Sequence, residues 1–194
     1  MNLGILEFYL IAVNIIGFIL FAINTWLYTY TATGQIDTAL TIFSLLGGSL
    51  GILLAILIFD RKAIKDNMMS RVFIACVFVI QIIMFLILKG FIVKDITLAF
   101  WSFLNSHKIV LIYLGIINFI TFAAFAIDKI AALERKSRIR IVTLLGLAFI
   151  GGSLGGLLAM YLFRHKTSKD YFTVGIPLII VMQVVVLFYL TNIT

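Results

Sequence analysis

The sequence predicts an all-α, polytopic integral membrane protein, and three observations predict this class. Apolar residue types make up 63% of the 194 residues and charged types only 12%, whereas a soluble domain has about 45–50% and about 25%. Six apolar segments run along the chain, each near or above the ~17–25 residues that a spanning helix needs. The strands of a membrane β-barrel would be shorter and would alternate in polarity. We therefore expect a multi-pass protein of the cell (inner or cytoplasmic) membrane.

The apolar segments share a length and a composition that suit helices in lipid. The first could be mistaken for a signal peptide, but it carries Glu7 and lacks both a basic stretch and a convincing cleavage site. We therefore expect it to remain in the mature protein. The six predicted helices cover 3–24, 38–59, 72–93, 109–127, 141–163 and 171–190.

An internal repeat is the strongest signal in the chain. Shifting the sequence by 104 residues aligns 14–90 with 118–194 without a gap, and it pairs "GGSLG" at 47–51 with "GGSLG" at 151–155. Self-similarity at a fixed offset indicates a repeated structural unit. We therefore predict two tandem three-helix repeats, at 1–90 and 109–194. The linker at 91–108 contains Trp101 among apolar and charged residues, which is typical of a helix lying at the membrane interface.

The second copy resembles a known family of bacterial membrane proteins. It carries Asp128-Lys129 at the end of a helix, then the glycine cluster, then "RHKTSK" at 164–169. This pattern is similar to that of the domain of unknown function 1294 family, clearly over 118–190 and in degenerate form over 14–90. The first copy has Asn24 in place of the aspartate and "DRK" at 60–62 in place of Arg-His-Lys, and the second lacks a Pro-Glu pair after "RI" at 140–141. The resemblance implies a membrane fold and carries no activity.

The glycine clusters have two interpretations. A Gly-x-x-x-Gly spacing lets two helix backbones approach closely in lipid, which makes these glycines helix-packing residues. Alternatively, each cluster turns a re-entrant hairpin, because broken helices are allowed where protein or a water cavity covers the freed backbone groups. The residues concerned are Gly47, Gly48, Gly51, Gly151, Gly152 and Gly155.

The distribution of Lys and Arg bears on these alternatives, because cytoplasmic loops collect them. Six full spans place nine of the 15 inside and six outside, whereas four spans plus two re-entrant hairpins place 12 inside and three outside. However, the loop at 25–37 has no Lys or Arg although its repeat partner at 129–141 has five. An external loop would show that loss if the two copies face opposite ways. We therefore predict six spans in an inverted-topology repeat, with the re-entrant arrangement as the alternative.

The net charge of +7 points to lipid rather than to nucleic acid. The cations lie in short loops that flank the apolar segments, so no soluble domain presents a nucleic-acid groove. The stretch "ERKSRIR" at 134–140 continues a membrane helix, where each basic residue gains about 1 kcal/mol from anionic headgroups. We expect the lipid bilayer and its anionic headgroups as partners, with a second copy or another membrane protein as a further candidate.

Two groups of residues are candidates for binding a solute. The first is a helical stripe of Asn and Phe on the first helix of each copy, spaced i, i+4, which is also what a helix-packing seam would show. The second is the basic patch after the second glycine cluster, since clustered Arg and Lys suit a phosphate or carboxylate, although headgroup anchoring would need the same residues. The candidate binding residues are Asn14, Phe18, Asn118, Phe122, Asp128, Arg164, His165, Lys166 and Lys169.

Signatures of soluble enzymes are missing from the sequence. It contains two histidines and a single cysteine, with no paired-ligand spacing for zinc and no phosphate-binding loop. We predict no catalytic residue, no metal and no cofactor. The duplicated architecture favours a transporter or channel for a small solute, with an anion as the candidate class. The alternatives are an accessory subunit of a membrane complex and a membrane enzyme acting on a lipid or phosphorylated headgroup.

Overall fold

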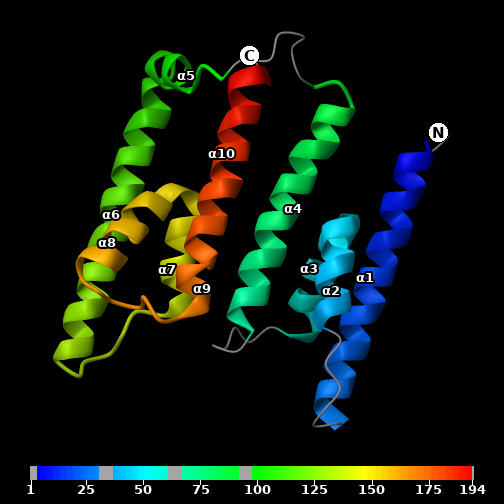
Figure 1. Cartoon of the computed structure of the whole chain (residues 1–194), viewed down its shortest axis with the longest axis horizontal. Helices are drawn as coiled ribbons and strands as arrows, with labels where there is room; N and C mark the ends of the chain where they lie inside the picture. The colour runs from blue at the N-terminus through cyan, green and yellow to red at the C-terminus, as the bar shows by residue number, and fades with distance from the viewer. Residues whose placement is uncertain (1–3, 31–36, 61–66, 92–97, 194) are drawn as a thin grey trace. The chain divides into compact units, whose positions relative to one another are not determined.

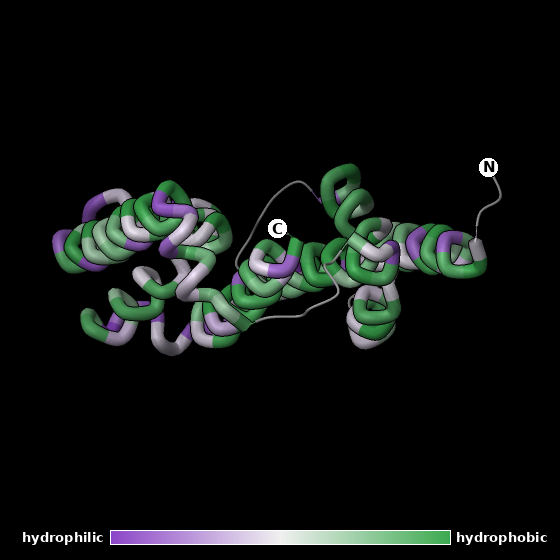
Figure 2. Tube along the Cα trace, turned by 90° about the horizontal axis from the view of Figure 1, so that it is seen from above, coloured by the Kyte–Doolittle hydropathy of each residue, from purple (hydrophilic) through white to green (hydrophobic). Residues whose placement is uncertain are grey.

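A computed structural model describes residues 4–30, 37–60, 67–91 and 98–193. All regular structure in these ranges is helical (Figure 1). Six helical segments are long and apolar enough to cross a membrane: Ile5–Tyr28, Thr38–Phe59, Met68–Leu88, Lys108–Leu133, Ile141–Leu162 and Asp170–Ile193. Apolar residues cover most sides of these helices (Figure 2). The predicted helical class and the six apolar segments are therefore confirmed, and they indicate a multi-pass membrane protein.

The chain forms two compact units, Met1–Ile82 and Ile83–Thr194. In the first unit, α1 (Ile5–Tyr30) is followed by α2 (Asp37–Phe43), a π-helical turn η1 (Ser44–Gly48), α3 (Ser49–Phe59) and the start of α4 (Met68–Leu88). In the second, α5 (Phe100–Ser106) precedes α6 (Lys108–Leu133), α7 (Ile141–Leu147), a π-helical turn η2 (Ala148–Gly152), α8 (Ser153–Leu162), α9 (Asp170–Thr173) and α10 (Gly175–Ile193). Of the predicted interfacial linker, α5 is helical and exposes 76% of Trp101, whereas residues 92–97 lie outside the described ranges.

The second apolar segment of each unit is broken at a glycine. Gly47 has φ +114° and Gly151 has φ +129°, a left-handed region that glycine adopts without a steric penalty. A residue with a Cβ continues a right-handed helix instead. The helical direction therefore changes at these two positions, between α2 and α3 and between α7 and α8.

The break turns the second unit's segment into a hairpin. The backbone N–H of Ile139, just before α7, donates to Asp128, and so do His165 and Lys166, just after α8. A straight 22-residue helix would separate its ends by about 33 Å, yet these two ends meet at one carboxylate. Figure 1 shows α7 and α8 running in different directions from the bend, with both outer ends on the same side of the unit.

The segment 141–163 is therefore bent and is not the single straight helix that the sequence predicts. The physical reason is the left-handed backbone at Gly151, which apolar length alone does not reveal. In the first unit, Leu40 of α2 shares a buried cluster with Ile52 and Ile56 of α3. Together with the left-handed backbone at Gly47, this shows that the first unit's segment is also bent.

A second glycine in each cluster allows a helix to approach its neighbour. A Cβ at Gly51 would lie 1.9 Å from the carbonyl oxygen of Asn14, and a Cβ at Gly155 would lie 2.0 Å from that of Asn118. These distances are shorter than any non-bonded contact, so only glycine lets α3 lie against α1 and α8 against α6. The two interpretations of the clusters therefore describe different glycines, one that turns the chain and one that packs it.

Candidate functional site

A fully buried carboxylate lies at the base of the second hairpin and binds three polar groups there. Asp128 lies on α6 and has no exposed surface. Its Oδ1 accepts a hydrogen bond from the backbone N–H of Ile139 at 2.9 Å. Its Oδ2 accepts from His165 Nε2 at 2.9 Å and from Lys166 Nζ at 2.6 Å. We call these four groups the Asp128 cluster.

The loop after α8 turns two of its basic side chains inward. Arg164 and Lys166 have φ of +44° and +63°, which is uncommon for residues with a Cβ and often marks a functional or constrained position. This conformation points His165 and Lys166 toward Asp128, whereas Arg164 and Lys169 are exposed. The predicted basic patch therefore divides into an inner pair that binds Asp128 and an outer pair that faces away.

Lys166 contacts an aromatic ring as well as the carboxylate. Its Nζ lies 4.8 Å from the centre of the Phe172 ring, and Phe172 packs edge-on against Phe125 with ring centres 5.5 Å apart. Burial, together with the positive charge of Arg138, lowers the pKa of Lys166, although the hydrogen bond and charge of Asp128 oppose this shift. A buried ion pair of this kind costs several kcal/mol to break because one charge is left uncompensated. The cluster can thus fix both ends of the hairpin to α6.

The predicted Asn residues bind the broken backbone of the hairpins. Asn118 Nδ2 donates to the carbonyl oxygens of Leu114 and Gly151, and its Oδ1 accepts from the N–H of Gly155. Asn14 makes the corresponding contacts with Leu10, Gly47 and Gly51. Because a broken helix leaves peptide groups without helical partners, each Asn supplies the bonds that the break removes.

The predicted Phe residues lie at contacts between helices. Phe122 packs against Phe163 with ring centres 5.5 Å apart, and Phe18 packs against Phe59 at 5.8 Å. Each pair joins the first helix of a unit to the end of the second segment. The structure therefore brings Asp128, His165 and Lys166 together, and it places Asn118 and Phe122 farther along the α6–α8 contact.

Other residues at the hairpin bends are not among the predicted site residues. Gln183 of α10 donates through Nε2 to the carbonyl oxygens of Ala148 and Phe149, at 2.7 and 3.1 Å, and its Oε1 accepts from Ser153. Tyr113 donates its hydroxyl to the carbonyl of Ile150. In the first unit, Gln81 contacts Ser44, Leu45 and Ser49, and Tyr9 contacts Leu46. The signal that could have found them is a polar residue at a similar place in two otherwise apolar segments, as with Gln81 and Gln183.

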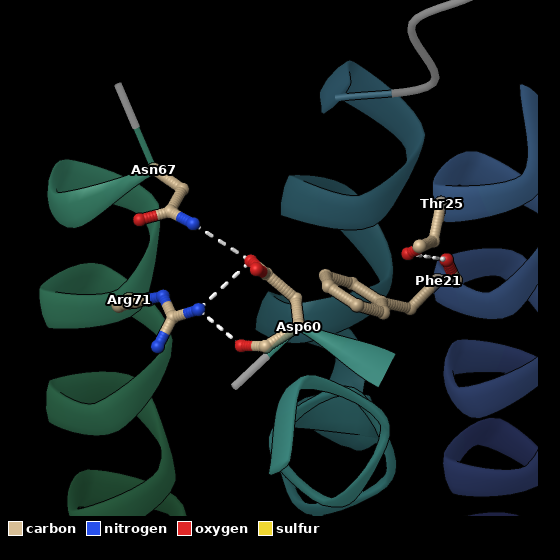
Figure 3. A network of polar contacts seen from close by, with 5 residues as sticks. All are labelled: Phe21, Thr25, Asp60, Asn67 and Arg71. Carbon is tan, nitrogen blue, oxygen red and sulfur yellow. Dashed lines mark hydrogen bonds and ion pairs between the residues drawn. The ribbon is translucent and has the colours of Figure 1, made fainter. Parts of the chain in front are cut away.

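The first unit has a different ion pair at the base of its hairpin (Figure 3). Asp60 Oδ2 accepts from Asn67 Nδ2 at 2.7 Å and from Arg71 at 2.8 Å, and Arg71 also donates to the Asp60 carbonyl. This network ties the end of α3 to α4 rather than to α1. The basic residues predicted to correspond to the inner pair, Arg61 and Lys62, lie outside the described residues.

The described ranges contain no group of three or more His, Cys, Asp or Glu side chains placed to hold a metal ion. In the Asp128 cluster the third side chain is a lysine, whose ammonium occupies a carboxylate oxygen that a metal would use. The chemistry available to this cluster is therefore hydrogen bonding and charge pairing.

Comparison with known proteins places the second unit in a family. A family described as "Protein of unknown function (DUF1294)" matches residues 118–172. The chain is also similar to "Uncharacterized protein YsdA" of Bacillus subtilis (strain 168), with 38% identity over 79 residues, which cover 41% of this chain and 89% of that protein. The chain belongs to the DUF1294 family. No solved structure matches it.

The DUF1294 match confirms the resemblance seen in the sequence and covers the structural features described above. Residues 118–172 include Asn118, Asp128, both arms of the hairpin at 141–162, and the inner pair His165 and Lys166. The part of the chain that defines DUF1294 membership is therefore the hairpin with the residues that hold it. The names of the family and of the relative carry no activity.

Proposed function

We propose that this DUF1294 protein is a small transporter or channel of the cytoplasmic membrane that conducts a small solute. The observation that carries the proposal is the hairpin of the second unit, which turns at Gly151 and returns to the Asp128 end of α6. Non-helical backbone at membrane depth is tolerated where protein buries it or where it lines a water-filled cavity. Broken helices of this kind form the solute sites of many transporters.

The proposed topology has four spans and two re-entrant hairpins. The spans are α1, α4, α6 and α10, and the hairpins are α2–α3 and α7–α8. Each unit then crosses the membrane twice, so the two units have the same orientation rather than the inverted one expected from six spans. This arrangement places 12 of the 15 Lys and Arg residues on one side, which the positive-inside rule assigns to the cytoplasm.

Matched contacts support the proposed duplication. Most partners in the two units differ in number by 104: Tyr9 with Leu46 and Tyr113 with Ile150, Asn14 with Gly51 and Asn118 with Gly155, Phe18 with Phe59 and Phe122 with Phe163. The glutamines differ by only 102, although Gln81 and Gln183 make corresponding contacts at the bends. The contacts of the third segments therefore match at an offset of 102 rather than at the 104 of the sequence alignment.

The bends offer a direct test of the proposal. Ile150 lies beside Gly151 and is 53% exposed, so a bend that lines an aqueous path would present this side chain to water. We would replace Cys76, the one cysteine of the chain, by alanine and introduce Ile150→Cys. The control is Phe119→Cys, because Phe119 is an exposed apolar residue on α6, where we expect lipid contact.

Both variants would be reconstituted in liposomes, and flux would be measured for small anions (chloride, phosphate, acetate) and small cations (sodium, potassium). We expect flux above that of protein-free liposomes for one of these classes. A charged thiosulfonate reagent should block it in the Ile150→Cys protein and leave the Phe119→Cys protein unaffected. Absence of flux for every solute, or equal inhibition of the two variants by the reagent, would count against a transport pathway at the bend.

A further inference from the structure

The hairpin gathers basic residues from two separate segments at one end of the second unit. The segment 134–140 enters the hairpin and the segment 163–169 leaves it, and the Asp128 cluster joins the two. The exposed cations that this fold brings to that end form what we call the basic surface. Its members are Arg135, Arg138, Arg140, Arg164 and Lys169.

The acidic residues at this end are too few, or already paired, to neutralise the basic surface. Asp128 is fully buried and is bound to Lys166 and His165. Glu134 pairs with Lys136 at 2.7 Å. Asp170, at the start of α9, is the third acid and is exposed. The basic surface therefore has five exposed cations. Asp170 is the one exposed acid at this end that is not part of an ion pair described for this unit.

Exposed apolar side chains adjoin these cations. Leu133 is 71% exposed next to the first basic segment, and Tyr161 and Leu162 are 61% and 69% exposed next to the second. A surface for a soluble anion or for nucleic acid would have polar surroundings, whereas a membrane interface places apolar side chains and Tyr directly below a layer of cations. The combination fits the boundary between lipid tails and headgroups.

We propose that the basic surface is a binding site for anionic phospholipid headgroups, which would hold the open end of the second hairpin at the membrane interface. The phosphate of the headgroup accepts hydrogen bonds from the Arg side chains, while the acyl chains contact the exposed apolar side chains beneath. This inference does not depend on solute transport, because it concerns the ends of the hairpin and not the bend.

The test compares two ends of the same unit. The first variant is R135Q/R164Q, which removes one cation from each segment of the basic surface and leaves the Asp128 cluster intact. The matched control is K89Q/K108Q, which removes two cations outside the basic surface, one of them the first residue of α6. Delipidated protein in an uncharged detergent would be titrated with phosphatidylglycerol, with phosphatidylcholine of the same acyl chains, and with inorganic phosphate, and bound lipid would be counted by native mass spectrometry.

We expect the wild-type protein to bind phosphatidylglycerol in preference to phosphatidylcholine. R135Q/R164Q should weaken that binding about fivefold for each cation removed, and K89Q/K108Q should leave it unchanged. An equal loss in the control would show a general charge effect and would overturn the proposal. Equally tight binding of inorganic phosphate would assign the surface to a free anion instead. Circular dichroism of each variant shows whether it is folded.

Discussion

At the scale of single residues, Asp128 is a buried group at which three polar contacts of the second unit meet. Its carboxylate accepts a hydrogen bond from the N–H of Ile139, just before the hairpin begins. It also binds His165 and Lys166, just after the hairpin ends. The sequence predicted a basic patch of Arg164, His165, Lys166 and Lys169 with Asp128 as a further candidate, because their residue types and the family pattern both point to them, but it did not separate the inner pair from the outer one. It could not predict Ile139, because that contact uses a backbone N–H, which any residue other than proline supplies.

The Asp128 cluster makes a prediction about stability. Asp128→Asn should lower the free energy of unfolding by about 3–5 kcal/mol, because it leaves the buried Lys166 without a counter-charge. The double variant D128N/K166M should recover much of that loss, since it removes the uncompensated charge. Denaturant unfolding in detergent, followed by circular dichroism, measures both.

The control for Asp128→Asn is Glu134→Gln, which breaks an ion pair whose side chains are 72% and 49% exposed. Exposed pairs contribute about 0–1 kcal/mol, so this variant should unfold close to the wild type. If D128N and E134Q behaved alike, the cluster would have no special role in holding the hairpin.

At the scale of elements, each hairpin depends on glycines with separate tasks. Gly151 provides the left-handed backbone of the bend, and Gly155 provides the close approach of α8 to α6. The sequence presented these tasks as competing hypotheses, because the spacing of glycines shows neither a backbone angle nor a neighbouring atom. The polar residues that complete the bend, Gln183 and Asn118, lie on other helices, so no local pattern around the glycines could identify them.

Close packing of α8 on α6 can be tested with two glycines of the same unit. Gly155→Ala should destabilise the protein by at least about 1–3 kcal/mol, because its Cβ would lie 2.0 Å from the backbone oxygen of Asn118 and the helices must separate. Gly115→Ala is the matched control, since no described atom outside its own helix and chain neighbours lies within 4 Å of the added Cβ. Alanine there should stabilise α6 by roughly 0.5–1 kcal/mol. Thermal melting in detergent compares them, and equal melting temperatures would contradict this packing.

At the scale of the whole molecule, composition and hydropathy predicted the helical membrane class and all six apolar segments. They could not predict the path of the second segment in each unit, because apolar length measures how far a chain could reach and not whether it turns back. The count of Lys and Arg residues favoured re-entrant hairpins, whereas the comparison of two loops favoured six spans. The Lys and Arg counts depend on where every loop lies, whereas the comparison of 25–37 with 129–141 assumed that a loop lost its cations only by changing sides. The topology proposed here follows the counts.

The remaining prediction concerns the side of the membrane reached by the two ends of the second hairpin. Ser137 precedes α7 and Thr167 follows α8, and both are exposed. In a Cys76→Ala background, single cysteines at these positions would be probed in intact cells with a membrane-impermeant maleimide. We expect both to be protected in intact cells and to react after permeabilisation, because a hairpin keeps its ends on one side and the positive-inside rule places that side in the cytoplasm.

Ser106→Cys is the control for this labelling experiment, because Ser106 lies just before the opposite end of α6 and should react in intact cells. Reaction of Thr167→Cys with protection of Ser137→Cys would mean that residues 141–162 cross the bilayer, which would restore the six-span inverted arrangement. Reaction of both in intact cells, with Ser106→Cys protected, would keep the hairpin but reverse its orientation. The basic surface would then face outward, where anionic phospholipids of the cytoplasmic leaflet could not reach it.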